Sequence, residues 1–395
     1  MKLFIDALGA SAGGGLTYLW NVLPQFARHP EVTVSVLAAP AALLSSAGNV
    51  TVLEAPPLAG SWRRFLWEQS EIPKLLRKTG SEVLLCVGNF AVWKSPVPQI
   101  LLSRNSLYTS RDFRRDLWRR GDYRLLLDTR VKAILGRQSI RRAELTAAPS
   151  EAFVSELEEW TGHKVTALYH GFDGEQFFRD ATSLPAELQE KLIAAEGATR
   201  LLFVSHYNYY RNFETLFRAL ARLKQRLPSR RFRLVLTCEL SDKANPGTYR
   251  TGEARALLRQ LGIENDVAQL GSVAYSQLHR LYRACDIYVT PAYTETFAHP
   301  LVEAMAAGLP IVASDIPVHR EITAGAALFF EKFSPDDLAD RVVELVDSPS
   351  RPGDLRERAL RRAADFSWKK HVEQLIVMAQ NLVRRPGCNS FAISR

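Results

Sequence analysis

The sequence predicts an α/β protein with two doubly wound domains, on three observations. At 395 residues the chain is longer than a single hydrophobic core usually supports. Short apolar runs alternate with helix-like segments in both halves, which is typical of parallel sheets covered by helices. A run of glycines follows the first apolar run, where such domains bring their backbone close to a ligand.

The first half, up to about residue 180, begins with a candidate strand at residues 2–8. Gly13, Gly14 and Gly15 then open a helix whose buried stripe includes Leu19 and Phe26. A glycine run alone is more often a flexible turn than a ligand loop, but its place after the first strand favours a ligand. Further candidate strands lie at residues 32–38, 50–53, 82–87, 98–102, 144–149 and 165–169.

The second half follows a small, polar and helix-prone segment, 181–198, which we expect to be a hinge. A last helix at about 366–385 carries an apolar stripe, and the resemblance described below implies that it packs back on the first domain. The tail after Pro386 is expected to be disordered. We therefore predict domains at residues 1–180 and 199–365. The main candidate strands of the second domain lie at residues 201–205, 231–239, 285–291, 309–314 and 326–331, with a helix at 335–347.

The stretch Glu295–Asp315, ETFAHPLVEAMAAGLPIVASD, joins two buried strands through a short helix with Pro300 in its first turn. Such a βαβ unit forms an anion site from its loop and from the free N–H groups at the helix N-terminus. Glu295 in the loop and Glu303 in the first helical turn are predicted to face one crevice and to accept hydrogen bonds from sugar hydroxyls. The alternative is that Glu303 complements the helix dipole while Glu295 is solvated.

The same stretch closely resembles the donor-site signature of the family 4 glycosyltransferases, in the glutamate pair, its spacing and the EAMAAGLPIVASD tail. The resemblance implies the GT-B fold, in which two Rossmann-like domains face each other across a cleft, and retaining transfer from a nucleotide-sugar. It places Glu303 on the nucleotide ribose, and Glu295, as a catalytic residue, near the donor sugar and its phosphates. It also brings the backbone amides of Phe297, Ala298 and His299 to the donor, although the family usually has glycine at Ala298.

Other donor-site residues follow from the same resemblance. Arg211 and Asn212 stand where the family has Lys-Gly or Lys-Asn. Arg211 is thereby assigned to the donor diphosphate, as a catalytic cation that can form two parallel hydrogen bonds. His206 stands where the family often has a second cation, and we include it in donor binding. The backbone near Val273 is assigned to the nucleobase, with a tight turn as the alternative.

The resemblance also concerns the first domain. Gly14 and Gly15 belong to a glycine loop that faces the donor phosphates and the acceptor. Residues 170–178, HGFDGEQFF, resemble the family segment Asn-Gly-Val-Asp-x-x-x-Phe, which forms a turn and is more structural than catalytic. The family often has an acid or a histidine in its first-domain cleft, whereas this chain has Arg104 and Asn105 after the corresponding strand.

Most of the formal net charge of +9 lies between Leu101 and Arg142. No nucleic-acid recognition motif accompanies these arginines, so we expect no nucleic-acid partner. A solvated helical face and a functional basic surface explain the charge equally well. Residues 62–78 also mix tryptophan with basic side chains, which suits an anionic membrane surface. Because the family's first domain receives the acceptor, often a lipid-linked glycan, we predict reversible membrane association and such an acceptor, with a soluble acceptor as the alternative. The basic residues chosen for this role are Arg114, Arg115, Arg119 and Arg120.

The sequence contains no Asp-x-Asp motif, which favours a site without a metal ion. The four cysteines lack metal-ligand spacing and indicate reduced thiols of a cytoplasmic protein. The start MKLFIDALG predicts a strand rather than a signal peptide, and no apolar run approaches membrane-spanning length. The predicted function is a cofactor-free retaining glycosyltransferase of cell-surface glycan or glycolipid assembly. The alternatives are a nucleotide-sugar epimerase of the same fold and a glycoside hydrolase that uses Glu295 and Glu303.

Overall fold

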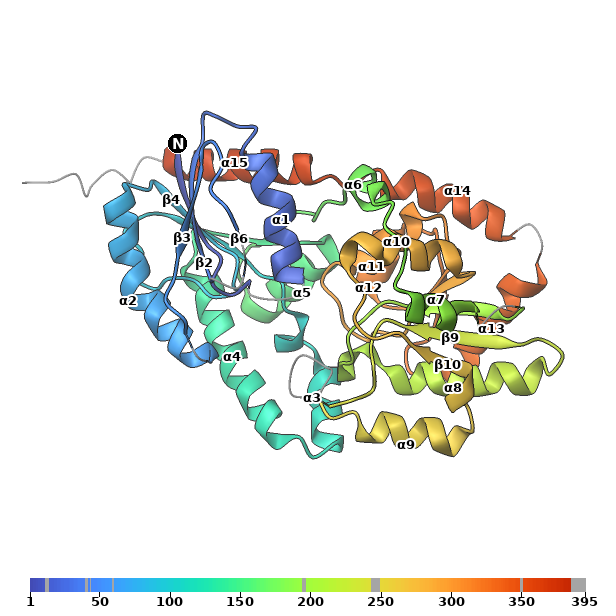
Figure 1. Cartoon of the computed structure of the whole chain (residues 1–395). Helices are drawn as coiled ribbons and strands as arrows, with labels where there is room; N and C mark the ends of the chain where they lie inside the picture. The colour runs from blue at the N-terminus through green and yellow to red at the C-terminus, as the bar shows by residue number, and fades with distance from the viewer. Residues whose placement is uncertain are drawn as a thin grey trace, which may run out of the picture. The chain divides into compact units, whose positions relative to one another are not determined.

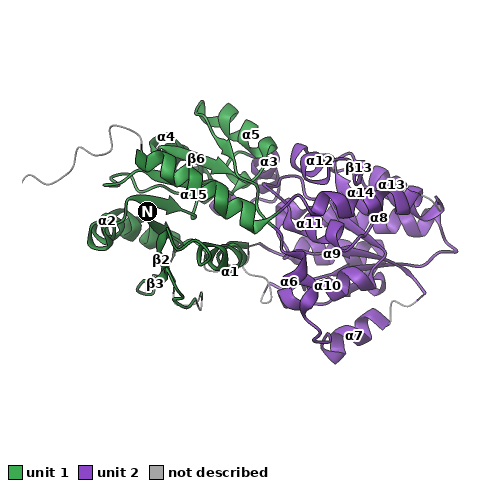
Figure 2. Ribbon diagram, turned by 90° about the horizontal axis from the view of Figure 1, so that it is seen from above, with its two compact units in different colours: residues 1–109, 127–171, 367–395 green, residues 110–126, 172–366 purple. Residues whose placement is uncertain are grey.

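The computed structural model describes residues 1–10, 14–39, 42, 44–58, 60–193, 197–242, 249–348 and 351–384. Gly13 and the tail after Pro386, on which we made predictions, lie outside these residues. The chain divides into two compact units, which are coloured separately in Figure 2. The first unit comprises Met1–Thr109, Leu127–Gly171 and Ser367–Arg395, and the second comprises Ser110–Leu126 and Phe172–Phe366.

The first unit contains a parallel sheet with the strand order β3-β2-β1-β4-β5-β6-β7 (Figure 1). Lys2 of β1 pairs with Thr33 of β2, and Leu3 of β1 pairs with Val83 of β4. Chain order therefore reverses between β1 and β4, the kind of switch point at which doubly wound sheets bind ligands. The strands are β1 (Lys2–Asp6), β2 (Thr33–Ala38), β3 (Val50–Glu54), β4 (Val83–Cys86), β5 (Gln99–Leu102), β6 (Leu145–Ala148) and β7 (Thr166–Ala167).

Helices cover both faces of this sheet. Because successive side chains of a strand point to opposite faces, Leu3 and Ile5 of β1 join one hydrophobic layer and Phe4 joins the other. The layer around Phe4 includes residues from α2 and α5. The helices of this unit are α1 (Gly14–Phe26), α2 (Ser61–Thr79), η2 (Ser106–Tyr108), most of α4 (Tyr123–Arg142), α5 (Glu151–Thr161) and α15 (Trp368–Arg384).

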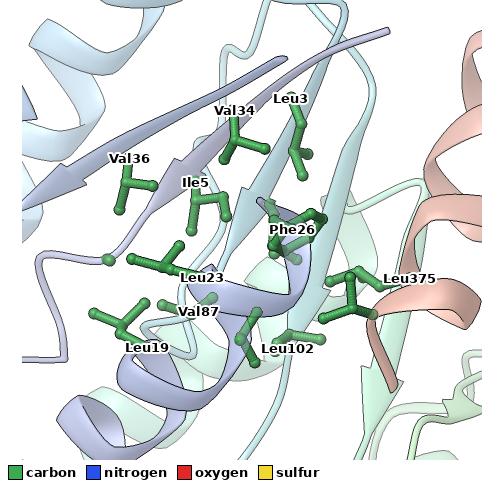
Figure 3. Packing of buried hydrophobic residues seen from close by; sticks show 14 of the residues in the cluster. Leu3, Ile5, Leu19, Leu23, Phe26, Val34, Val36, Val87, Leu102 and Leu375 are labelled. Atoms are coloured by element: carbon green, nitrogen blue, oxygen red, sulfur yellow. The ribbon is translucent and has the colours of Figure 1, made fainter. Parts of the chain in front are cut away.

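The layer around Leu3 is completed by the C-terminal helix. Leu19, Leu23 and Phe26 recur at helical spacing along α1 and point into this layer, as Figure 3 shows. Leu375 of α15 joins the same cluster. The chain thus returns from the second unit to bury the α1 face of the first.

The second unit repeats the architecture with the strand order β10-β9-β8-β11-β12-β13, all parallel. Its chain order reverses between β8 and β11, which is therefore its switch point. The strands are β8 (Thr199–Phe203), β9 (Phe232–Leu236), β10 (Val267–Gln269), β11 (Ile287–Thr290), β12 (Ile311–Ser314) and β13 (Leu328–Phe330).

Among the helices of the second unit, α8 packs against α9 and α13, and α11 packs against α12 and α14. Serine side chains cap several helices of the chain, as at α13, where the Ser334 hydroxyl accepts a hydrogen bond from the Asp337 N–H at 3.2 Å. The helices are α3 (Arg111–Arg119), α6 (Gly174–Arg179), α7 (Ala186–Ile193), η3 (Tyr209–Arg211), α8 (Phe213–Arg226), α9 (Gly252–Leu261), η4 (Glu264–Asp266), α10 (Tyr275–Ala284), α11 (His299–Ala306), α12 (Pro317–Thr323), α13 (Pro335–Asp347) and α14 (Arg351–Ala363).

The α/β class with two doubly wound sheets is confirmed, and the unit boundaries cross our predicted domains at two places. Helix α3 and the first turn of α4 group with the second unit, although the first-unit segment Leu127–Gly171 separates them from the rest of it. Residues 172–180, which we placed in the first domain, and the segment 181–198, described except for residues 194–196, also group with the second unit. There α7 buries Leu188 and Leu192.

Candidate active site

The second unit brings Arg211 and Glu295 together at its switch point. Because β8 and β11 are neighbours, the loops that follow them lie side by side at the carboxyl edge of the sheet. Arg211 ends η3 in the loop after β8, and Glu295 lies in the loop after β11. The Arg211 guanidinium donates a hydrogen bond to the Glu295 carboxylate, and both side chains are mostly buried. The two residues that we predicted as catalytic therefore form one ion pair.

The Arg211 guanidinium is also held by an aromatic ring. Its Cζ lies 5.1 Å from the centroid of Tyr210. Its Nε is buried and has no hydrogen-bond partner among the described residues. A guanidinium presents five N–H donors and keeps its charge, so Arg211 can bind an anion in addition to Glu295.

Asn212 shapes the same loop through its backbone. It has φ 54° and ψ 48°, the left-handed conformation that glycine and asparagine adopt most readily. Its Nδ2 donates to the Pro291 carbonyl at 3.2 Å, and its Oδ1 accepts from the Thr215 hydroxyl at 2.9 Å. This buried amide ties the loop after β11 to the start of α8. Its side chain and its backbone N–H, which donates to the Tyr209 carbonyl at 2.9 Å, are both used inside the protein, and the donor contact predicted for Asn212 stays a prediction.

Ala298 starts α11 in an unusual conformation for alanine. It has φ 63° and ψ 65°, a left-handed geometry that costs an L-residue roughly 1–2 kcal/mol and glycine nothing comparable. The neighbouring Phe297 ring is buried, 5.3 Å from the Phe366 ring centroid and 4.9 Å from that of His299. The left-handed turn is the physical reason for glycine at this position in the family pattern, and this chain keeps the turn with alanine.

Glu303 lies deeper than we predicted. It is the fifth residue of α11, so the placement in the first helical turn is wrong, because the helix starts only at His299. Its carboxyl group is 4% exposed and accepts a hydrogen bond from the Tyr282 hydroxyl at 2.8 Å. Burial raises the pKa of Glu303 to about 7, which the bond from Tyr282 partly opposes. At neutral pH this group is therefore close to half ionised.

Two histidines accompany Arg211. His206 is exposed to solvent on one side. Its partly buried side and the nearby charge of Arg211 lower the pKa of the imidazole. His319 is fully buried, and its Nδ1 lies 3.0 Å from the Ser314 carbonyl oxygen. Burial lowers the pKa of His319 to about 4, with Arg211 contributing, and its Nε2 has no partner among the described residues. No motif in the sequence points to His319, which is placed near Arg211 by the packing of α12.

Val273 and the glycines lie at separate positions. Val273 is half-buried in the loop after β10, where Gly271 has φ 76° and packs near Glu239. Gly14 and Gly15 belong to the first unit. A Cβ on Gly15 would lie 2.8 Å from the Ala10 Cα, so close packing requires glycine there, whereas a Cβ on Gly14 would meet nothing within 4 Å. The donor contacts predicted for these residues stay predictions.

Helix α3 packs against the loops that carry Arg211 and Glu295. The Tyr293 hydroxyl, two residues before Glu295, donates to Asp116 at 2.9 Å. The Phe113 ring stands edge-on to Tyr210, with centroids 6.2 Å apart. Sequence reasoning missed this contact, because α3 ends at Arg119 and the rest of the second unit begins only at Phe172.

Arg120, at the end of α3, anchors the helix to the second unit. Its guanidinium bonds to Asp116 at 2.8 Å, to Glu214 at 2.9 Å and to Glu253 at 2.7 Å, and it lies over the Tyr209 ring. Its side chain is 12% exposed. The choice of Arg120 as part of an exposed basic surface is therefore wrong, because three carboxylates neutralise it.

The first unit has a buried carboxyl pair near the end of β1. Asp6 and Glu68 are both buried beside Arg64, whose Nε lies 3.2 Å from Glu68. Burial raises the pKa of both carboxyl groups, and their mutual repulsion contributes at Glu68. A cavity of about 280 Å³ adjoins them, lined by Arg64, Leu8, Ser61 and Pro57 among others. Sequence reasoning did not single out this cluster.

Among the described residues, no helix is long and apolar enough to cross a membrane. In the same part of the chain, no three His, Cys, Asp or Glu side chains group as ligands for a metal ion. The metal-free site stays a prediction that chelation tests.

Residues 186–366 match the sequence family described as glycosyl transferases group 1. Over 243 residues the chain is 30% identical to a protein named D-inositol 3-phosphate glycosyltransferase 2 from Catenulispora acidiphila. The aligned region covers 58% of this chain and 54% of that protein. Over 178 residues it is 33% identical to the D-inositol 3-phosphate glycosyltransferase of Corynebacterium aurimucosum, covering 44% of this chain and 41% of that protein. The chain thus spans about half the length of the curated relatives it matches.

Solved structures resemble nearly the whole chain. The sucrose-phosphate synthase of Thermosynechococcus elongatus has a TM-score of 0.74 at 16% identity and covers 97% of this chain and 99% of its own. The Anabaena protein HepE, solved with UDP-glucose, has a TM-score of 0.69 at 16% identity, covering 96% and 100%. WaaG, described as a glycosyltransferase involved in lipopolysaccharide biosynthesis, has a TM-score of 0.68 at 15% identity, covering 98% and 100%. At these identities the likeness concerns the fold, and the predicted GT-B fold is confirmed.

The match of residues 186–366 includes every residue of the Arg211 and Glu295 site described above. The match shows that residues 186–366 belong to the group 1 glycosyl transferases, the family 4 enzymes that the donor-site stretch resembles.

Proposed function

We propose that this protein is a retaining glycosyltransferase that moves a sugar from a nucleotide-sugar to an acceptor hydroxyl. The pairing of Arg211 with Glu295 at the switch point of the second unit carries the proposal. A cation there suits a diphosphate, and carboxylates suit sugar and ribose hydroxyls. The solved complex of HepE with UDP-glucose supports a nucleotide-sugar as the donor.

The residues take distinct roles in this reaction. Arg211 stabilises the negative charge that develops on the leaving diphosphate, which is where preorganised electrostatics contribute most. Glu295 orients Arg211 and accepts a hydrogen bond from the donor sugar. Glu303 accepts a hydrogen bond from the ribose. The leaving phosphate receives the acceptor's proton, so no separate protein base is needed.

The glycoside hydrolase alternative is less favoured. Such an enzyme places two carboxyl groups on either side of one glycosidic bond. Here Glu295 is bonded to Arg211, whereas Glu303 is buried against Tyr282. An epimerase would use the same donor site without an acceptor, so activity assays must separate it.

A panel of nucleotide-sugars tests the proposed function. Each donor is incubated with the protein, and nucleotide release, epimerisation and free sugar are followed with and without glycan acceptors. Acceptor-dependent release of nucleoside diphosphate is expected, with the anomeric configuration retained in the product. Epimerisation without an acceptor would favour the epimerase. EDTA should leave transfer intact, and loss of activity that Mg²⁺ or Mn²⁺ restores would contradict the metal-free mechanism.

We further propose that the protein works in cell-surface glycan or glycolipid assembly and associates reversibly with anionic membranes at the cytoplasmic face. Helix α4 supports this proposal. Leu127 and Ile134 lie on one side of the helix with exposed fractions of 65% and 62%, and Arg130 and Arg137 are exposed beside them. Basic residues near an anionic bilayer contribute about 1 kcal/mol each, and apolar side chains insert at its interface. A lipid-linked glycan acceptor follows from this location.

Liposome flotation tests the membrane proposal. The protein should float with anionic liposomes at low salt and be released as salt rises. Replacing Arg130 and Arg137 with glutamine should reduce the floated fraction. The matched control replaces Arg218 and Arg259, two exposed arginines of the second unit, and should float like the wild type. Equal loss in both pairs, or no flotation of the wild type, would refute membrane docking through α4.

A further inference from the structure

Arg104 stands at the carboxyl edge of the first unit's sheet, next to the switch point of that sheet. It follows β5, the neighbour of β4. Its Nη2 donates to the Val87 carbonyl at 2.7 Å, and its backbone N–H donates to the Asn89 side chain at 2.6 Å. Both partners lie in the loop after β4, and Asn89 has a φ of 68°. The backbone and one end of the guanidinium are therefore fixed to this loop.

The loop after β4 also packs tightly against the loop after β1. A Cβ on Gly9 would lie 2.8 Å from the Gly88 Cα, so the two backbones touch. Helix α1 starts shortly after Gly9, has no acidic residue in its first turn and carries Tyr18. Arg104 thus contacts the loop after β4 and Tyr18 of α1, two elements at the switch point of the first sheet.

No carboxylate neutralises this guanidinium. Among the described residues Arg104 has no ion-pair partner, and the titratable group that acts on it is the Tyr18 hydroxyl. Its Cζ lies 4.6 Å from the Tyr18 ring centroid. Burial lowers the pKa of Arg104, but arginine stays charged in proteins. Arg120, which three carboxylates surround, shows how this same chain compensates a buried arginine elsewhere.

The nearby groups are held neutral. The Tyr18 hydroxyl and the His371 Nε2 are 2.9 Å apart, and His371 Nδ1 lies 2.8 Å from the Tyr169 carbonyl oxygen. Burial lowers the pKa of His371 to about 4 and raises that of Tyr18, so neither carries charge near neutral pH. The Nε of Arg104 is buried without any hydrogen-bond partner in the described chain. An uncompensated, half-buried cation with an unused buried donor is costly, and a bound anion reduces that cost.

We propose that Arg104 is the centre of an oxyanion subsite of the first unit, and that it takes a phosphate group carried by the acceptor. The identity of the carrier rests on the proposed glycosyltransferase function, whereas the anion site itself does not. The guanidinium edge suits phosphate oxygens, and the uncharged start of α1 opposes no anion. The second unit has its own cation, Arg211, for the donor diphosphate. The first unit is therefore free to select a phosphorylated acceptor over its neutral counterpart.

The first test uses the wild-type protein. Butanedione modifies accessible arginines, and peptide mass spectrometry quantifies the modification of Arg104 without ligand, with inorganic phosphate, and with a nucleoside diphosphate. Phosphate should reduce the modification of Arg104 at least fivefold, and the nucleoside diphosphate should protect it no better than phosphate does. The exposed Arg115 serves as the internal control and should react equally in all samples. Equal modification of Arg104 with and without phosphate would overturn the anion subsite. So would the absence of any modification of Arg104 in both samples.

The second test separates the acceptor from the donor as the source of the phosphate. Arg104→Gln removes the charge, and Arg104→Lys keeps it without the planar fork. Calorimetric affinity for the nucleoside diphosphate should stay within twofold of wild type in both variants. A tenfold loss of nucleoside diphosphate affinity in Arg104→Gln would assign the phosphate to the donor and overturn the acceptor assignment. Failure of the proposed function would instead appear as wild-type protein that binds no nucleoside diphosphate, and the phosphate protection of Arg104 would still decide the subsite.

Discussion

At the scale of single residues, Glu303 combines burial with a titratable carboxyl group. Its pKa is raised to about 7 in the folded protein, against 4.5 for the ordinary carboxyl. The folded state therefore binds the proton more tightly than the unfolded state does. The stability that this proton contributes is fully present below pH 4.5 and is lost as the pH rises to about 7.

Glu303→Gln should remove this pH dependence, because glutamine is neutral at every pH. We expect the unfolding free energy of Glu303→Gln, relative to that of wild type, to increase by on the order of 3 kcal/mol as the pH rises from 4.5 to 7.5. Urea unfolding at a series of pH values measures the difference. Glu190→Gln, at an exposed carboxylate of α7, is the control. A difference between wild type and Glu303→Gln that does not vary with pH would contradict the raised pKa.

Glu303→Ala addresses the proposed ribose contact. Losing a hydrogen bond to a charged group should weaken nucleotide binding by roughly 1.5–3 kcal/mol. Calorimetry with the nucleoside diphosphate checks this at pH 8, where the wild-type carboxylate is mostly ionised. Unchanged affinity in a folded variant would remove Glu303 from the donor site.

Arg211→Ala separates the diphosphate from the nucleoside. If Arg211 binds the diphosphate, this change should weaken nucleoside diphosphate binding far more than nucleoside binding. Arg211→Lys should retain part of the difference, because a point charge remains without the planar fork. Comparable losses for both ligands would mean that Arg211 acts only by holding Glu295 in place.

At the scale of elements, α3 supports the loops of the candidate site. It contacts them through Phe113 and Asp116, and Arg120 ties its end to α8 and α9. Lys332, in the loop after β13, adds an ion pair with Asp112 of α3 at 2.5 Å. A helix from the first half of the sequence thus becomes part of the second unit.

Arg120→Gln should destabilise the second unit, because it leaves partly buried carboxylates without their cation. Removing one partner of a buried ion pair costs about 3–5 kcal/mol, and the exposure of Glu253 places the expected loss at the lower end. Arg119→Gln, at an exposed neighbour on the same helix, should change stability by less than about 0.5 kcal/mol. Urea unfolding compares the two variants. Equal stability of both would show that Arg120 does not anchor α3.

At the scale of the whole molecule, the chain crosses between its units several times. It leaves the first unit for α3, returns with α4, and comes back a last time with α15. Trp368, Val372, Leu375 and Ile376 of α15 are buried in the first unit's core. Folding of the first unit therefore depends on residues that follow the whole second unit in the chain.

A chain that ends at Phe366 tests this dependence. Burial of each large apolar side chain contributes roughly 1.5–3 kcal/mol to the free energy of unfolding. The loss of these four side chains therefore approaches the whole stability of a domain, about 5–15 kcal/mol. Hydrogen exchange should show lost protection in α1 and β1 and retained protection in the strands of the second unit. A chain that ends at Arg384 is the control and should behave as the full chain does. Full protection of α1 in the shorter chain would contradict the packing role of α15.

The sequence by itself determined the local elements and the class of fold. Alternating apolar runs specify buried strands because backbone pairing and burial act over a few residues, so the predicted strands needed only shifts at their ends. The glutamate pair and the arginine after β8 were visible because a donor site on a βαβ unit needs those groups at those places in the chain.

Tertiary structure alone decided which of these groups meet and what their charges become. Arg211 pairs with Glu295 because strand order brings β8 beside β11, and neither loop encodes its neighbour. Burial, which depends on the whole fold, raised the pKa of Glu303 and left Arg104 without a counter-charge. Arg120 resembled the exposed arginines around it in the sequence, because the local run of charges does not show that Glu214 and Glu253 pair with it in the folded protein. Contacts between residues far apart in sequence depend on packing that no local pattern contains, whereas strands and helices depend on neighbours that the sequence places side by side.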